Sequence, residues 1–160
     1  PPILIKPHRQ RRDGAKGDSG RNEDTPVGRT QSKLCLDLGL NTVYFLQKYN
    51  ILREHLRETN HEKFHKLKRC IPITGFTYMH NTVGFNTNKG GEIGVCLDGT
   101  VNQIFHVLIH ELAHCTVREY NHSKEFWDNY IELRDICVQL GIYEKIPIRT
   151  TFCGEHVQDK

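Results

Sequence analysis

The sequence predicts an α+β domain in which a long helix is followed by a small β-sheet and two further helices, with an extended N-terminal arm in front. Three observations support this order. Apolar residues recur at three- and four-residue steps over residues 34–57, 101–117 and 123–139, as on the buried face of a helix. Between the first two ranges lie two extended segments around a glycine-rich turn. The first 33 residues, in contrast, contain no aromatic side chain.

The arm comprises residues 1–33, and residues 34–160 form the predicted domain. The arm carries four of the six prolines and eight Lys or Arg against four Asp or Glu. Such a segment cannot bury enough apolar area to fold alone, so we expect it to be disordered in isolation. Its Arg9, Arg11 and Arg12 could contact nucleic acid or neighbouring protein chains, and a solvated tail is the plain alternative. The domain itself has 14 Lys or Arg against 15 Asp or Glu, so the basic character belongs to the arm.

The first helix and the strands are predicted from periodicity and turn residues. The basic stretch from His61 to Arg69 is expected to continue or cap the first helix before Pro72. Residues 75–97 change character and predict a β-hairpin whose two strands flank the turn Lys89-Gly90-Gly91.

The two later helices are predicted over residues 101–117 and 123–139, each with one apolar face. Gly141 follows the last apolar residues and is expected to end the final helix. The last twenty residues show no regular pattern, and we expect them to be irregular.

The cysteines and the hydropathy bear on the cellular setting. The six cysteines include no C-x-x-C pair, which argues against a cysteine-bound zinc. Their even number leaves a disulfide framework open, but the chain has enough aromatic residues to build a core, so we expect reduced, mostly buried thiols in an intracellular, reducing setting. No apolar run approaches the roughly 18–20 residues that cross a bilayer, so no transmembrane segment is expected. The cysteines are Cys35, Cys70, Cys96, Cys115, Cys137 and Cys153.

The segment IHELAH, at residues 109–114, is the most informative part of the sequence. Residues four apart lie on the same face of a helix, so His110 and His114 can both direct an imidazole nitrogen at one metal ion. Glu111 lies beside such an ion without coordinating it and can serve as general base. With Zn²⁺ bound, water activated by the zinc and Glu111 would attack a peptide carbonyl near neutral pH. The apolar setting favours this interpretation over two surface histidines on a solvated helix.

A catalytic zinc needs a third protein ligand, and His122 is the leading candidate. Seven residues separate it from His114, which is enough for the chain to leave the helix and turn back. Glu119 is the alternative. His106 lies one turn before His110 on the same face, but three consecutive i, i+4 histidines of a straight helix cannot converge on one ion. We therefore expect His106 to lie beside the site or to be unrelated to it.

The sequence indicates the other residues of a catalytic zinc site less specifically. A donor to the developing oxyanion should exist, and Tyr120, Tyr143 and His156 are the candidates, although each residue type is more often structural. The ligand histidines should also have hydrogen-bond acceptors, for which Asp128 and Glu125 are within reach.

The motif HELAH followed by NHSKEFW resembles the zincin-like metallopeptidases of the WLM, SprT and YgjP type, in which HExxH is followed by a histidine and an aromatic pair. The likeness is strongest to small metallopeptidases encoded by giant DNA viruses. In these, a strand like FNTNKGGEIGVCLD precedes the motif helix, and a segment like HSKEFWDNYIELRDICVQLGIY and a terminal Cys-Gly, here Cys153-Gly154, follow it. The likeness covers residues 76–159.

This resemblance implies a minimal zincin-like fold with zinc held by His110, His114 and His122, and with Glu111 as the catalytic residue. It also implies a viral protein, so the virus particle is the second expected location.

Two main functions follow from these interpretations. The first is a zinc-dependent metallopeptidase that acts on a protein or peptide substrate. The alternative is a structural or assembly protein, a minor component of a virus particle, that uses the domain as a scaffold while residues 1–33 contact neighbouring chains. WLM- and SprT-type relatives act on proteins bound to DNA, so the resemblance also implies nucleic acid as a weaker partner. Hydrolysis of a non-peptide substrate would need the same site.

Overall fold

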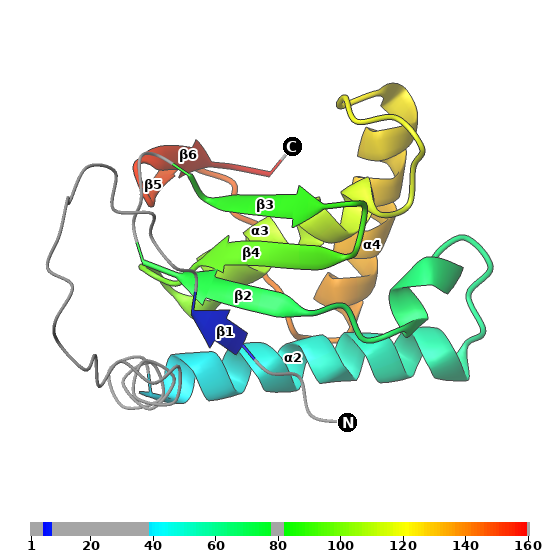
Figure 1. Cartoon of the computed structure of the whole chain (residues 1–160), viewed down its shortest axis with the longest axis horizontal. Helices are drawn as coiled ribbons and strands as arrows, with labels where there is room; N and C mark the ends of the chain where they lie inside the picture. Colours follow the sequence, from blue (N-terminus) through cyan, green and yellow to red (C-terminus); the bar gives the residue numbers. More distant parts are fainter. Residues whose placement is uncertain (1–4, 8–38, 78–81, 160) are drawn as a thin grey trace, which may run out of the picture.

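The computed structural model describes residues 5–7, 39–77 and 82–159 of the chain (Figure 1). Its order of elements confirms the predicted α+β class, with a long helix, a small sheet and two further helices. Among these residues, none of the helices has the length and hydropathy of a bilayer-spanning segment. The helices are α2 (Gly39–Glu58), α3 (Val101–His114) and α4 (Lys124–Gln139).

The main sheet has four strands in the order β1-β2-β4-β3. The central pair, β2 and β4, is parallel, and β1 adds to the outer side of β2 in parallel as well. Strand β3 pairs with β4 in the antiparallel sense and forms the opposite edge of the sheet. The strands are β1 (Ile5–Pro7), β2 (Ile73–Phe76), β3 (Gly84–Thr87) and β4 (Glu92–Cys96).

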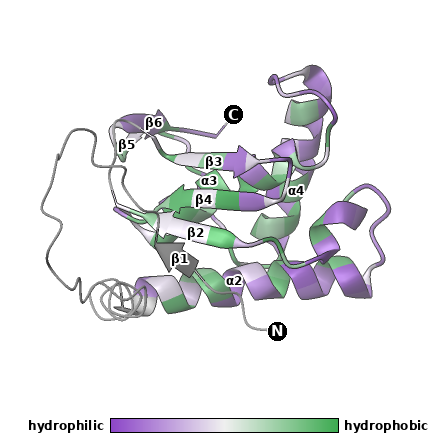
Figure 2. Ribbon diagram, viewed as in Figure 1, coloured by the Kyte–Doolittle hydropathy of each residue, from purple (hydrophilic) through white to green (hydrophobic). Residues whose placement is uncertain are grey.

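Helix α3 occupies the centre of the domain. It contacts β3 and β4 on one side and α2 and α4 on the others. In Figure 1 it lies behind the sheet, with α2 running below and α4 beside it. Nine of its residues are buried, which explains why this helix is apolar around most of its circumference. Figure 2 shows the same contrast, with hydrophobic residues along β4 and hydrophilic ones on the outer turns of α2 and α4. The motif helix is therefore held on several sides by packed elements.

The predicted hairpin is confirmed as β3 and β4. Its turn places Asn88 and Lys89 at φ 52° and 48°, and Gly90 at φ 105°. Asparagine and glycine tolerate this left-handed region well, which is why the sequence pattern located the turn. The stretch predicted as the first strand of the hairpin is more complex, because it contains the end of a separate strand, β2, as well as β3.

The stretch from His61 to Arg69 was expected to continue or cap the first helix, and its continuation is wrong. Helix α2 ends at Glu58, and a separate 3₁₀ turn, η1, spans His65–Lys68. Asn60 terminates the helix by adopting a left-handed conformation with φ 47°. The N–H of Asn60 donates to the Arg57 carbonyl, and the N–H of His61 donates to the Leu56 carbonyl. These two bonds make a Schellman motif, which ends a helix.

Helix α4 ends in the same way, as predicted from Gly141. Its φ is +73°, its N–H donates to the Val138 carbonyl, and the next N–H, that of Ile142, donates to Cys137.

The expectation of an irregular C-terminal segment is wrong, as is that of fully reduced cysteines. Strands β5 (Thr150–Phe152) and β6 (Glu155–Val157) form a second, antiparallel sheet. Cys153 lies in their turn and forms a disulfide with Cys96 at the end of β4. Three other cysteines of the described ranges are free thiols, namely Cys70, Cys115 and Cys137. The disulfide fastens the second sheet to the first.

Three residues of the predicted arm form β1, in which Ile5 lies opposite Ile73 of β2. The rest of the arm, residues 1–4 and 8–33, lies outside the described residues. Its expected disorder in isolation, its contacts with neighbouring chains or nucleic acid, and the boundary at residue 34 stay predictions.

Candidate metal centre

The histidine motif lies on the last turns of α3. The helix begins at a capping box, in which the Thr100 hydroxyl accepts from the Gln103 N–H and the Gln103 side chain accepts from the Thr100 N–H. It ends at His114, three residues before the predicted end at Val117. The hydroxyl of Thr116 donates to the Ala113 carbonyl (2.6 Å), which supplies one of the partners that the final carbonyls of a helix lack. The early end frees the following residues to form a loop.

That loop returns His122 to the motif histidines. The imidazole nitrogens of His110, His114 and His122 all lie within 4.8 Å of one another, and no carboxylate or thiol of the described residues joins this set. The Nε2 atoms of His110 and His122 are 3.1 Å apart. His122 is exposed and the other two are half-buried, so the cluster opens to solvent on one side. The structure thus brings together the three residues that the sequence singled out as ligands.

The donor set fits a transition-metal ion. Four-coordinate zinc with ligands at about 2.0–2.1 Å places ligand nitrogens about 3.3 Å apart. The 3.1 Å between His110 and His122 is close to that value. Three imidazoles that leave a fourth position open match the usual composition of a catalytic zinc site, whereas structural sites close with a fourth protein ligand.

Aromatic rings of α4 pack behind the cluster. The Phe126 ring centroid lies 5.0 Å from that of His110 and 4.4 Å from that of His114, and Trp127 lies 5.7 Å from His122. Phe126 is fully buried, so it fixes α4 against the core while its ring packs against the histidines. The Ser123 hydroxyl caps this helix by accepting from the Phe126 N–H, which places His122 just before the helix start.

Burial keeps the two motif histidines neutral. Burial, with smaller contributions from the neighbouring histidines, led by His114, lowers the pKa of His110 to about 3. Burial likewise lowers the pKa of His114 to about 4, with additional contributions from His122 and Lys89. A metal ion binds neutral imidazole, so both side chains are in the binding form at pH 7 without losing a proton.

Glu111 lies beside the cluster with only 7% of its surface exposed. Burial raises its pKa to about 7. Its side chain borders a small pocket of about 160 Å³ together with His114, Asn86, Lys89 and Tyr120. A carboxyl group that titrates near neutrality and lines the same pocket as one of the three imidazoles, that of His114, can exchange a proton with a bound molecule.

Two residues of the hairpin, Asn86 and Lys89, complete the site and were not identified from the sequence. The Asn86 amide donates to the Glu111 carbonyl (2.9 Å) and its oxygen accepts from the Gly90 N–H (2.8 Å). The Lys89 ammonium donates to the carbonyls of His114 (3.1 Å) and Glu119 (2.6 Å). A cation at the C-terminal end of a helix is favourable, so the turn both caps α3 and holds the following loop. The only sequence signal was their place in the predicted hairpin, Asn86 in its first strand and Lys89 in its turn.

Gly84 allows β3 to approach α3 this closely. A Cβ atom at this position would lie 2.5 Å from Val107 Cγ1 and 2.9 Å from the Gly94 carbonyl oxygen, and 3.5 Å from Glu111 Cγ. Strand β3 therefore packs directly against the stem of Glu111.

The structure separates the three candidates for an oxyanion donor. Tyr120 lies at the mouth of the pocket, 79% exposed, with the Lys89 ammonium 4.4 Å from its ring centroid. Tyr143 is buried and its hydroxyl donates to Asp159. His156 is exposed on β6, in the second sheet. Only Tyr120 of the three lines the pocket beside Glu111.

The other candidates do not join the cluster. Glu119 is exposed and contributes its carbonyl to Lys89. Asp128 pairs with Lys124 (3.2 Å) on the outer face of α4, and Glu125 is exposed nearby. Neither carboxylate bonds to a site histidine in the described part of the chain.

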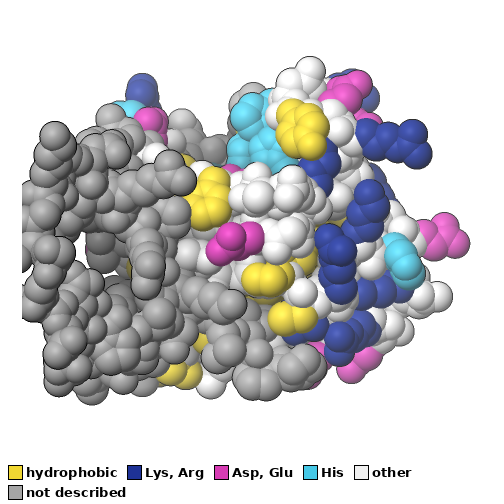
Figure 3. All heavy atoms as spheres, in the orientation of Figure 1, with side chains coloured by type: hydrophobic (Ala, Val, Ile, Leu, Met, Phe, Trp, Pro, Cys, Tyr) yellow, Lys and Arg dark blue, Asp and Glu magenta, His cyan; other side chains and the backbone are white. Residues whose placement is uncertain are grey.

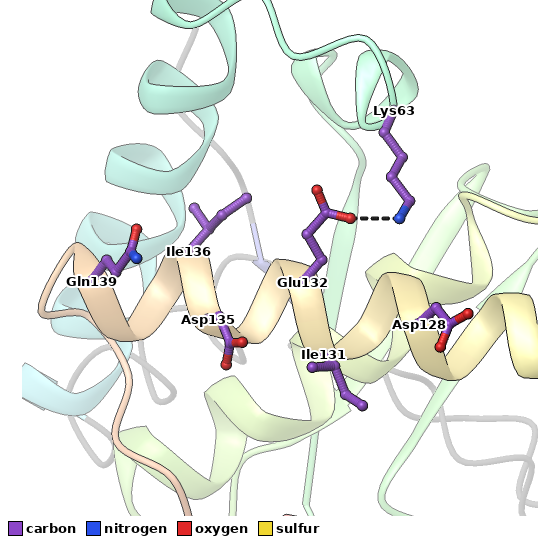
Figure 4. A pocket seen from close by; sticks show the side chains of 7 residues that line it. All are labelled: Lys63, Asp128, Ile131, Glu132, Asp135, Ile136 and Gln139. Atoms are coloured by element: carbon purple, nitrogen blue, oxygen red, sulfur yellow. Dashed lines mark hydrogen bonds and ion pairs between the residues drawn. The ribbon is translucent and has the colours of Figure 1, made fainter.

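A separate pocket of about 440 Å³ runs along this outer face of α4. Figure 4 shows Lys63 reaching across it to Glu132. Its lining includes Asp128, Asp135 and Ile131 and none of the site residues.

His106 belongs to a buried polar cluster one turn from His110. Its Nδ1 lies 2.9 Å from the Tyr143 hydroxyl, 3.2 Å from that of Tyr130 and 3.5 Å from an Asp159 oxygen. Both hydroxyls also donate to the Asp159 carboxylate. The expectation that His106 is not a ligand agrees with this placement, because its Nδ1 faces away into the C-terminal segment.

No family model matches the sequence. The chain is 30% identical over 128 residues to an uncharacterised protein of Acanthamoeba polyphaga mimivirus. The match covers 68% of this chain and 64% of that protein, so the chain spans less than two thirds of the relative's length. Among solved structures, the crystal structure of Wss1 from Saccharomyces cerevisiae is similar with a TM-score of 0.45 and 17% identity, over 61% of this chain and 77% of that one.

Proposed function

We propose that this chain is a zinc-dependent metallopeptidase whose ligands are His110, His114 and His122. The observation that carries the proposal is the convergence of three imidazoles, one of which, His114, lines a small pocket together with the buried carboxyl group of Glu111. Three neutral nitrogen ligands and an open fourth position suit zinc in a hydrolytic role. The zinc would supply a Lewis acid that polarises the substrate carbonyl and makes water acidic enough to attack it near pH 7.

Glu111 is the general base in this proposal. Its carboxyl group accepts a proton from the attacking water and delivers it to the nitrogen of the departing amine. Its pKa of about 7 is close to the value at which a group exchanges protons most effectively at neutral pH. The carbonyl of Glu111 is fixed by Asn86, so the backbone that carries the base is held by the neighbouring strand.

Tyr120 is the proposed donor to the developing oxyanion. It is at the pocket, whereas the hydroxyl of Tyr143 is engaged with Asp159 and His156 lies in the second sheet. Its ring rests against Lys89, which orients the phenol beside the site.

The domain responsible comprises residues 34–160, and the virus particle is its proposed location. The mimivirus relative supports a viral origin. Disulfides persist in oxidising surroundings, so the Cys96–Cys153 disulfide favours the virus particle over the reducing interior of a cell.

The test is proteolysis of an unfolded protein substrate by the zinc-loaded chain, with Glu111→Gln beside the wild type. The substitution removes the proton acceptor while keeping the size of the side chain. We expect wild type to release new N-termini and Glu111→Gln to lose at least about 100-fold in rate, as removal of a general base commonly does. Equal rates for the two proteins would show that this centre does not catalyse the reaction.

A further inference from the structure

A basic groove of about 590 Å³ lies between η1 and the turn of the β3–β4 hairpin. Four of its lining residues carry a positive charge, and it includes no carboxylate. Figure 3 shows Lys and Arg side chains gathered over the lower right of the molecule. The lining residues are His65, Lys66, Lys68, Arg69, Asn88 and Lys89.

Short-range bonds hold the groove in shape. The Arg69 guanidinium donates to the Gly90 carbonyl (3.3 Å), which joins the segment after η1 to the hairpin turn. The Lys68 ammonium donates to the Asn60 side chain (2.6 Å). Within the described ranges, no Asp or Glu forms an ion pair with Lys66, Lys68, Arg69 or Lys89. The positive charge of the groove is thus not neutralised by the described part of the protein itself.

Lys89 connects this groove to the proposed active site. It lines both the basic groove and the pocket that contains Glu111 and His114. The pocket and the groove therefore adjoin at Lys89, and a peptide bound beside His114 can extend toward Lys66 and Lys68.

We propose that the basic groove is a specificity subsite that binds Asp or Glu side chains of the substrate on one side of the cleaved bond. The inference rests on the proposed peptidase function, which it extends to a substrate class. Lys66 and Lys68 recognise the carboxylates by charge, and Lys89 links recognition to the catalytic pocket. Such pairs are exposed, so they select among substrates more than they add affinity.

The groove fits a short acidic peptide better than a nucleic acid. A nucleic-acid site follows a phosphate backbone over several charges and is usually part of a basic domain. Here residues 34–160 contain 14 Lys or Arg against 15 Asp or Glu, and the positive charge is confined to one compact groove. The outer face of α4 is acidic instead, with Asp128, Glu132 and Asp135 along one pocket (Figure 4).

The first experiment measures binding without turnover. Glu111→Gln protein is titrated into a fluorescent peptide containing three glutamates and into the same peptide with glutamines, and anisotropy is followed. We expect the acidic peptide to bind more tightly, and the added pair Lys66→Glu/Lys68→Glu to weaken its binding roughly tenfold or more. The matched control, Lys145→Glu/Arg149→Glu, reverses two exposed charges outside the groove and should retain the preference. Equal affinity for the two peptides, or equal effects of both charge reversals, would overturn the proposal.

Two further measurements separate the alternatives. Sequencing of the products that wild type releases from an unfolded protein should show Asp and Glu enriched at a fixed distance on one side of the cleaved bond. If wild type cleaves no protein but Lys66→Glu/Lys68→Glu still weakens binding of the acidic peptide, the proposed peptidase function is wrong and the groove remains a site for acidic peptides. If a single-stranded oligonucleotide of equal charge displaces the peptide and binds more tightly, the groove is a nucleic-acid site and the proposal is wrong.

Discussion

At the scale of single residues, burial and close approach determine the chemistry of the site. Glu111 is 7% exposed, and its pKa of about 7 is caused by that burial. The burial in turn depends on Gly84, because any side chain there would meet Val107 and the Gly94 carbonyl before β3 could reach its present place. A carboxyl group that is covered by a strand and still borders a pocket requires this small residue opposite it.

Gly84→Ala should therefore destabilise the fold. A Cβ 2.5 Å from Val107 Cγ1 must displace the strand or the helix, and overpacking of this kind costs about 1–3 kcal/mol. Urea denaturation followed by circular dichroism measures the free energy of unfolding. The control is Gly141→Asn, since a Cβ atom at Gly141 would meet no other atom within 4 Å and asparagine accepts its positive φ. Unchanged stability of Gly84→Ala would show that the close approach of β3 is not required.

The residues of the site differ in how far the sequence could reveal them. His110 and His114 are four residues apart on one helix, so local geometry alone predicts their common face, and Glu111 adjoins the first of them in the chain. His122 was found because the loop length and the following aromatic pair allow it to return. Asn86 and Lys89 contact the motif across 25 residues, and no local pattern encodes a contact of that kind.

At the scale of elements, the C-terminal segment is tied to α3 and α4 by the Asp159 carboxylate. This side chain accepts from the hydroxyls of Tyr130 and Tyr143 and from the Ile146 N–H. Burial by itself raises the pKa of Asp159, but the hydrogen bonds from His106, Tyr130, Tyr143 and the Ile146 backbone outweigh it and hold the pKa well below its usual range. The charged carboxylate is therefore the form that the folded protein stabilises.

Asp159→Asn should lower the free energy of unfolding by roughly 2–3 kcal/mol at neutral pH, because the buried donors around this side chain lose a charged acceptor. The sign of the pH dependence follows from the lowered pKa. The contribution of Asp159 to the free energy of unfolding is fully present above the unfolded-state pKa of about 3.9. It is lost as the pH falls toward the lower pKa of the folded state. Urea unfolding of both proteins should thus give a difference in stability that is constant from pH 5 to 7 and shrinks below about pH 4.

Asp128→Asn is the control for this series, because Asp128 is exposed and its partner Lys124 is on the surface. It should change stability by less than about 1 kcal/mol. A gap between wild type and Asp159→Asn that persists undiminished at about pH 2.5 would contradict the assignment of a charged, hydrogen-bonded carboxylate.

The sequence predicted the elements better than their ends. The helices and the hairpin follow from apolar periodicity and from the Asn-Lys-Gly-Gly turn. The end of α2 depends on one left-handed residue, Asn60, in a stretch whose composition is otherwise helical. The C-terminal strands β5 and β6 have three residues each, too few for an alternating pattern to be recognised.

At the scale of the whole molecule, the Cys96–Cys153 disulfide encloses both helices that form the candidate site. It joins the end of β4 to the turn of the second sheet across 57 residues. The sequence left this pairing open, because six cysteines without characteristic spacing do not specify which two meet.

Cys96→Ser/Cys153→Ser should lower the free energy of unfolding by about 4 kcal/mol, because the disulfide closes a loop of 57 residues and so reduces the conformational entropy of the unfolded chain. Thermal denaturation without reductant measures the loss. Cys70→Ser, at a half-buried free thiol, should have a far smaller effect. Thiol titration of the unreduced, denatured wild type should also detect two fewer free thiols than after reduction, and an equal number would refute the disulfide.

The proposed function depends above all on a zinc ion held by three histidines from one helix and the following loop. Elemental analysis of purified protein tests this directly, with His122→Ala beside the wild type and His156→Ala, an exposed histidine of β6, as the control. We expect about one zinc per chain in wild type and in His156→Ala, and a weakened or empty site in His122→Ala, because a catalytic zinc needs three protein ligands. Wild type without zinc after zinc-supplemented purification, or His122→Ala with a full complement, would contradict the three-histidine site.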